Sequence, residues 1–122
     1  MIKINNIEWI DVDTKEAELV LSDGENKLLV FSDGYSEFDC QVGVEFKEEL
    51  YAMVSSDVIQ VMNKPESVLP LGGFRQVITG TLIDKQNSLL KIGEYVLHFE
   101  SDIPNDVKEG ELLEFEVGRI DI

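Results

Sequence analysis

Hydrophobic and polar residues alternate along much of the chain with a period of two, the pattern of strands that bury one face. The pattern starts in residues 2–11, where Ile2 and Ile4 alternate with Lys3 and Asn5. A pair of asparagines follows Ile4 and predicts a bend or bulge before the apolar residues resume. The first element is therefore predicted to be a strand.

A β-hairpin is predicted next. Residues 15–21 place an apolar side chain at every second position from Ala17 to Leu21. The following residues 22–26 contain an Asp-Gly pair, which readily adopts the positive φ angles of a tight turn. Residues 27–32, KLLVFS, then supply the partner strand.

The middle of the chain changes period. Residues 33–36 predict a second turn, and residues 40–44 a short strand. In residues 45–54 the apolar positions follow i, i+4, i+7 and i+8, which is one face of a helix. These positions are Phe46, Leu50, Met53 and Val54. We therefore expect one short helix here.

Residues 58–62 predict a short strand, and residues 63–73 predict a linker because they contain two prolines and a glycine pair. The linker is too apolar to be freely solvated. We expect it to lie against the domain or to contact a partner. The candidate contact residues are Leu69, Leu71 and Phe74.

The last part of the chain predicts a compact antiparallel unit. Residues 74–83 form a strand in which Gly80 predicts a bend, a bulge or a close backbone approach. Residues 88–92 and 95–100 flank Gly93-Glu94, which has the residue order of a type II′ hairpin turn.

The final strand contains a change of phase. Its first apolar positions, Leu113, Phe115 and Val117, are out of step with Ile120 and Ile122. A shift of one residue exchanges the buried and exposed faces of a strand. We therefore predict a bulge at Gly118, with Arg119 and Asp121 pointing away from the face that Ile120 and Ile122 bury.

Many short strands, tight turns and at most one short helix predict an all-β fold. A small antiparallel barrel of the OB type, a Greek key with extra strands, fits best, and a β-sandwich is the alternative. We expect a single domain over residues 1–122. It would consist of an acidic β half (1–62), the linker (63–73) and a β unit (74–122).

Two strings carry a resemblance, SDG…LLVFS and GTLID…LLKIGEYVLHFESDIPNDVKEGELLEFEVGRIDI. They resemble a group of small uncharacterised bacterial proteins with this C-terminal pattern. The resemblance implies a bacterial, stand-alone domain. It implies no known activity.

Charge narrows the choice of partners. The chain has 25 acidic and 10 basic residues and a formal charge of −15. Non-specific nucleic-acid binding depends on Lys and Arg neutralising phosphates, so this charge disfavours it, and it disfavours anionic membranes equally. A basic partner would be attracted. The simpler reading is that acidity keeps the domain soluble.

Cys40 is the only cysteine, so no intramolecular disulfide forms. The first residues do not resemble a signal peptide, and no stretch is apolar enough to predict a membrane-spanning helix. We expect a cytoplasmic protein.

The sequence contains no catalytic or metal-binding motif. One histidine and one cysteine do not make a zinc site, and His98 is expected to be a surface or rim residue. Asp11 and Asp13 begin like a calcium loop, but the glycine and the distal glutamate of that motif do not follow. We therefore expect no catalytic residue, cofactor or metal.

Two functions stay open. The first is a non-enzymatic protein-binding module that engages a partner, favouring a basic one, through an acidic face or a sheet edge. An immunity-type protein that neutralises a basic toxin is one concrete version. The alternative is a binder of single-stranded nucleic acid or oligosaccharide that uses the face of an OB-like barrel.

Overall fold

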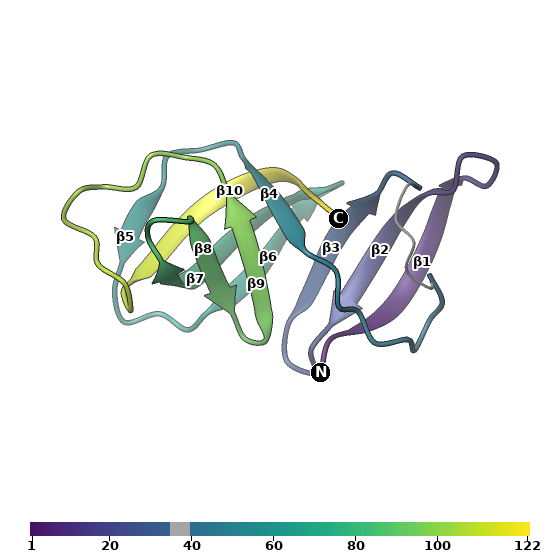
Figure 1. Cartoon of the computed structure of the whole chain (residues 1–122), viewed down its shortest axis with the longest axis horizontal. Helices are drawn as coiled ribbons and strands as arrows, with labels where there is room; N and C mark the ends of the chain where they lie inside the picture. The colour runs from purple at the N-terminus through teal and green to yellow at the C-terminus, as the bar shows by residue number, and fades with distance from the viewer. Residues whose placement is uncertain (35–39) are drawn as a thin grey trace.

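The computed structural model describes residues 1–34 and 40–122, and this part of the chain is all-β without a helix (Figure 1). The strands are β1 Lys3–Asp11, β2 Glu16–Ser22, β3 Lys27–Ser32, β4 Leu50–Val54, β5 Ile59–Val61, β6 Ser67–Gly72, β7 Arg75–Asp84, β8 Leu89–Ile92, β9 Tyr95–Phe99 and β10 Leu112–Asp121. None of the described residues forms a helix long and apolar enough to cross a membrane.

Five strands close into a barrel in the order β10-β4-β9-β8-β7 and back to β10. All contacts in this circuit are antiparallel except the parallel pair β4–β9. A three-stranded meander closed by two further strands is the arrangement of a small OB-like barrel, as predicted. The sandwich alternative does not apply.

The barrel interior is filled by every second residue of its strands, because successive side chains of a strand point to opposite faces. In β9, Tyr95, Leu97 and Phe99 are buried, and in β10 Leu113 and Phe115 are buried, as their alternation predicted. The outward residues of the same strands are left to form the outer surface of the barrel.

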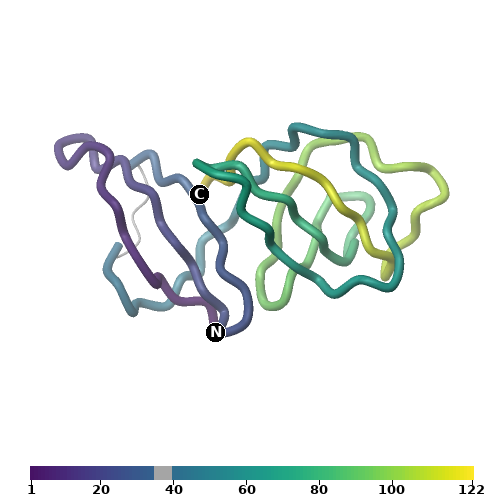
Figure 2. Tube along the Cα trace, turned by 180° about the vertical axis from the view of Figure 1, so that it is seen from behind, coloured from purple at the N-terminus to yellow at the C-terminus, as the bar shows by residue number. Residues whose placement is uncertain are grey.

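The strands β1, β2 and β3 form an antiparallel sheet beside the barrel, as Figure 2 shows from behind. The predicted hairpin is confirmed, with Ala17 and Leu19 fully buried. The predicted irregularity in β1 is also confirmed, as a register shift between Ile4 and Asn6. The sheet joins the barrel through a short parallel contact between β3 and the end of β10.

The helix predicted for residues 45–54 is wrong. Leu50–Val54 is strand β4, with Leu50 and Ala52 buried while Met53 is 53% exposed. Phe46, the other buried member of the supposed helical stripe, lies outside the strand. Helical spacing and strand alternation both fit so short a segment, and pairing with β9 and β10 decides between them.

The short strand predicted for residues 40–44 is also wrong. These residues form a turn beside β1, where Ile4 N–H donates to the Val44 carbonyl and Gly43 N–H donates to the Ile4 carbonyl. A turn was also predicted for residues 33–36. Residues 35 and 36 lie outside the described part of the chain, so this turn stays a prediction.

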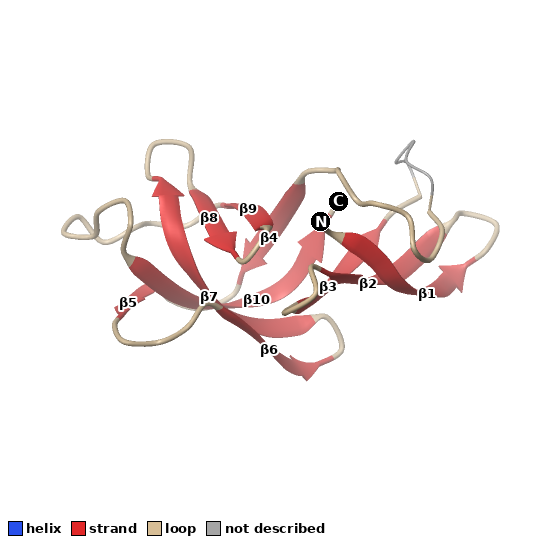
Figure 3. Ribbon diagram, turned by 90° about the horizontal axis from the view of Figure 1, so that it is seen from below, coloured by secondary structure: helices blue, strands red, loops and turns tan. Residues whose placement is uncertain are grey.

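The expected linker is largely a strand. Ser67–Gly72 forms β6, which pairs with β7 and lies at the end of the strand order, so the segment does lie against the domain (Figure 3). Proline is tolerated at such an edge because no second neighbour needs its missing N–H. The short strand expected in residues 58–62 is present as β5 and pairs with β10.

The predicted phase slip in β10 is present, since Val117 and Ile120 are both fully buried. The strand pairs with β7 up to Val117 and with β4 from Arg119 onward. The register is regular within each of these ladders, so the predicted bulge at Gly118 is wrong, and a change of partner strand takes its place. Arg119 and Asp121 are half-buried and bind each other beside the buried Ile120.

Gly80 marks a close backbone approach, one of the three roles predicted for it. A Cβ atom at this position would lie 2.7 Å from the Lys91 carbonyl oxygen and 2.7 Å from Leu90 Cδ2. The strand β7 can therefore pass β8 this closely only without a side chain here.

Candidate functional site

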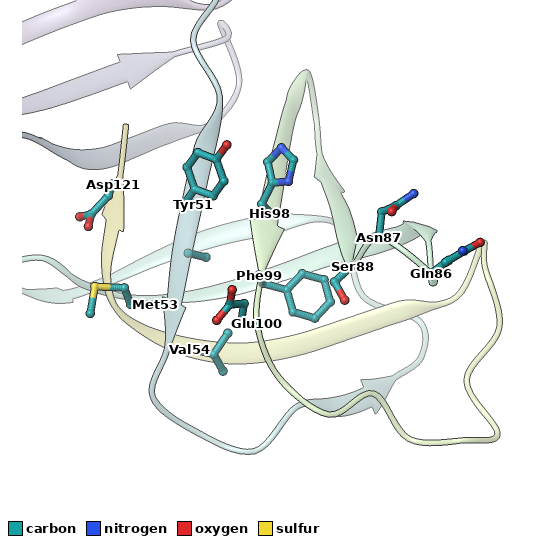
Figure 4. Close-up of a pocket in the computed structure, with 11 residues that line it drawn as sticks. Tyr51, Met53, Val54, Gln86, Asn87, Ser88, His98, Phe99, Glu100 and Asp121 are labelled. Carbon is teal, nitrogen blue, oxygen red and sulfur yellow. The ribbon is translucent and has the colours of Figure 1, made fainter. Parts of the chain in front are cut away.

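The parallel pair β4–β9 gives the barrel an outer face with an aromatic centre. In β4 the inward Leu50 and Ala52 leave Tyr51 and Met53 pointing outward, and the register sets Tyr51 directly opposite His98 of β9. Their rings stack with centroids 4.7 Å apart and planes 22° from parallel (Figure 4). Tyr51 is still 46% exposed.

A groove of 620 Å³ lies against this stack. Its floor includes Ala52 and Phe99, and one bank is the β7–β8 turn with the side-chain amides of Gln86 and Asn87. The opposite bank includes Asp121 at the end of β10, and Figure 4 shows these side chains around the strands β4 and β9. Its volume falls in the range of small-molecule and side-chain binding sites.

A second hollow of 290 Å³ lies on the other side of the stack. His98 lines both hollows, so they meet at this residue. The second hollow has an apolar base that includes Ile2 and Val96, and Val96 is 40% exposed. Among the described residues, its lining carries the carboxylates of Glu48, Glu49 and Glu94 and one lysine, Lys47.

Glu49 connects the aromatic stack to this acidic rim. The Tyr51 hydroxyl donates a hydrogen bond of 2.5 Å to Glu49 Oε2, and this bond raises the pKa of Tyr51. His98 Nε2 lies 3.9 Å from Glu49 Oε1. Tyrosine, histidine and glutamate thus form one contact group at the junction of the two hollows.

The acidic residues that line the two hollows differ in whether a basic group already pairs with them. Arg119 holds Asp121 with two bonds of 2.6 and 3.0 Å, and the N-terminal amine pairs with Glu94. Among the described residues, Glu48, Glu49 and Glu100 form no ion pair with lysine or arginine. Three carboxylates therefore remain available to a cation, at both ends of the stack.

His98 was expected to be a surface or rim residue, and it is partly exposed at the place where the two hollows meet. Its contacts are Tyr51 and Glu49, while Cys40 lines neither hollow. In residues 1–34 and 40–122, no three His, Cys, Asp or Glu side chains are placed to hold a metal ion. The Asp11 carboxylate accepts hydrogen bonds from the backbone of Asp13 and Thr14 in the β1–β2 turn.

The residues predicted to contact a partner lie elsewhere. Leu69 and Leu71 belong to β6 and are 57% and 40% exposed. Phe74 is half-buried and packs edge-on against Phe31, with ring centroids 5.9 Å apart. The structure does not bring these residues to the groove, and their role as a contact stays a prediction.

Sequence reasoning missed the groove because it placed Tyr51 and Met53 on a helix. One signal was present: in LYAMV the small Ala52 sits between two outward residues with large side chains, as in a strand that packs one face on a core. No family model, no curated protein and no solved structure matches the chain.

Proposed function

We propose that the protein is a non-enzymatic binding module whose groove over β4 and β9 holds a basic segment of another protein. The observation that carries the proposal is the combination of an exposed apolar and aromatic surface with carboxylates that pair with no lysine or arginine of the described residues. Tyr51 and Met53 supply the surface, and Glu48, Glu49 and Glu100 supply the charge.

The apolar and aromatic surface and the carboxylates both favour a lysine or arginine side chain. Its aliphatic stem can cover Met53, while its cationic end approaches a carboxylate or the exposed face of Tyr51. The overall charge of −15 adds long-range attraction, which raises the rate of association with a basic partner more than the strength of the final contacts. An immunity-type protein that neutralises a basic toxin is one concrete form of this function.

A charge-swap experiment tests the proposal. Fluorescence anisotropy would compare a labelled peptide rich in lysine and leucine with the same peptide carrying glutamate in place of lysine. The double variant Glu49→Gln with Glu100→Gln should weaken binding of the basic peptide about fivefold, since each exposed ion pair contributes about 0.5 kcal/mol. The matched control is Glu8→Gln with Asp13→Asn, which removes the same charge from exposed sites on β1 and its turn.

The position of the peptide gives a second readout. Amide chemical shifts should change in β4 and β9, with the largest changes around Tyr51 and His98. Equal losses of affinity in the two double variants would mean that net charge alone attracts the peptide. Shifts concentrated at Leu69 and Leu71 would move the contact to β6 and overturn the assignment of the groove.

A neutral oligosaccharide is the second candidate. The specific observation in its favour is that the exposed Tyr51 ring shares the groove with the amides of Gln86 and Asn87, since sugars pack on aromatic rings and bind amides through their hydroxyls. Single-stranded nucleic acid fits less well, because its phosphates would approach Glu100 and no Lys or Arg is among the described residues that line this groove. Binding of uncharged glycans that is insensitive to salt would favour this candidate over the basic peptide.

A further inference from the structure

We infer that the groove recognises an extended segment with two cationic side chains four residues apart and an apolar side chain midway between them. This inference rests on the proposed function and specifies the partner of the same surface. It follows from the positions of the two hollows relative to the Tyr51–His98 stack.

The two hollows lie one after the other along the strands. The hollow with Val96 and Glu49 precedes the stack in both β4 and β9, and the groove with Glu100 and Met53 follows it. Because β4 and β9 run parallel, both strands advance from one hollow to the other in the same direction. A ligand that lies along them meets the hollow rimmed by the acidic side chains of Glu48, Glu49 and Glu94, then the aromatic rings, then Glu100.

Strand geometry converts this order into a spacing. From Val96 to Glu100 a strand rises about 13 Å, at roughly 3.3 Å per residue. An extended ligand advances at the same rate, so side chains at its positions i and i+4 reach the two hollows together. Positions i, i+2 and i+4 share one face of an extended chain, which places the middle side chain over Tyr51 and His98.

The middle contact favours an apolar or aromatic side chain. Tyr51 is 46% exposed, so covering its ring removes apolar surface from water. At the ends, Glu49 and Glu100 have no lysine or arginine partner among the described residues. The surface therefore selects charge, apolar and charge in that order, with a defined separation.

Three peptides of about nine residues and identical composition test the spacing, each with two lysines and one leucine in an alanine and serine background. The first has its lysines at i and i+4 with leucine between them at i+2. The second has them at i and i+3, which directs them to opposite faces, and the third has them adjacent. Anisotropy with the full chain should show the first peptide binding about threefold more tightly than the others, as expected for one exposed ion pair.

A double-mutant cycle shows which lysine of the peptide contacts Glu49 and which contacts Glu100. Replacing one lysine of the first peptide by norleucine should abolish the effect of Glu49→Gln and leave that of Glu100→Gln intact, and replacing the other lysine should do the reverse. Amide spectra of both variants check that the barrel is folded.

The outcomes separate this inference from the proposed function. If all three peptides bind equally and both variants still weaken them, the groove binds basic segments but the two-point spacing is wrong. If no peptide binds the native chain, the inference and the proposed function both fail. Tighter binding of the i+4 peptide with no coupling to either carboxylate would also overturn the two-hollow arrangement.

Discussion

Replacing Gly80 by alanine should destabilise the barrel at the point where β7 passes β8. Neither Gly80 nor Gly118 has a positive φ, so alanine fits the backbone conformation at both positions and the surrounding space decides the result. At Gly80 the new Cβ would lie 2.7 Å from the Lys91 carbonyl oxygen, a backbone atom that the β7–β8 ladder holds in place. At Gly118 the nearest atom would be Ser55 Cβ at 4.0 Å, which is ordinary contact.

These distances set the expected magnitudes. Overpacking of this kind costs about 1–3 kcal/mol, while replacing glycine by alanine returns about 0.4–1 kcal/mol by restricting the unfolded chain. The net loss for Gly80→Ala should be about 1.5 kcal/mol, and Gly118→Ala should be neutral or slightly stabilising. With a urea m-value of about 1.5 kcal/mol per molar, the Gly80→Ala midpoint should fall by about 1 M.

Urea unfolding followed by tryptophan fluorescence and by circular dichroism measures both variants. Equal m-values would show that the shift in midpoint reports stability. If Gly80→Ala unfolds at the same urea concentration as Gly118→Ala, the close approach of β7 and β8 does not constrain position 80, and the reasoning fails.

Two further predictions concern polar contacts of the buried Gln76 and the half-buried Glu66. Gln76 donates to and accepts from the Leu29 backbone, each at 2.9 Å, so Gln76→Leu should leave that backbone unpaired, cost about 1–3 kcal/mol, and speed amide exchange at Leu29. Unchanged exchange at Leu29 would contradict this. For Glu66, burial alone raises the pKa, but hydrogen bonds from Thr81, Lys91 and the Gly93 N–H outweigh it and lower the pKa below the ordinary value. The lowered pKa stabilises the fold above the ordinary glutamate pKa, and that contribution is lost as the pH falls through the folded-state value. Glu66→Gln should therefore be less stable by about 1 kcal/mol at pH 7 and approach the native chain in acid, whereas a gap independent of pH in urea titrations would refute the linkage.

The sequence predicted the hairpins best, because their signals are local. The Asp-Gly turn before β3 and the Gly93 turn before β9 each lie between strands that alternate clearly, and adjacent strands in sequence pair in space. The burial phase of β10 was also predictable from the positions of Val117 and Ile120. Each of these depends on residues that are close together in the chain.

The groove could not be predicted, because its two strands are distant in sequence. Whether Tyr51 belongs to a helix or a strand depends on pairing with His98, and no local pattern in residues 45–54 specifies that partner. Likewise, the alternation of β10 predicts which of its side chains are buried. It does not predict that β10 pairs with β7 before Gly118 and with β4 after it. Long-range pairing therefore set the limit of what could be derived from the residues alone.

The parallel contact between β4 and β9 has a consequence for folding. The hairpins can form early from neighbouring residues, whereas β4 and β9 can meet only after a long loop closes, which is the slow step in folds rich in non-local contacts. The groove then exists only in the fully closed barrel. Any ligand of the groove should bind the native state alone and raise its melting temperature, and above the dissociation constant this rise should continue with the logarithm of ligand concentration, so thermal stability becomes a measure of affinity.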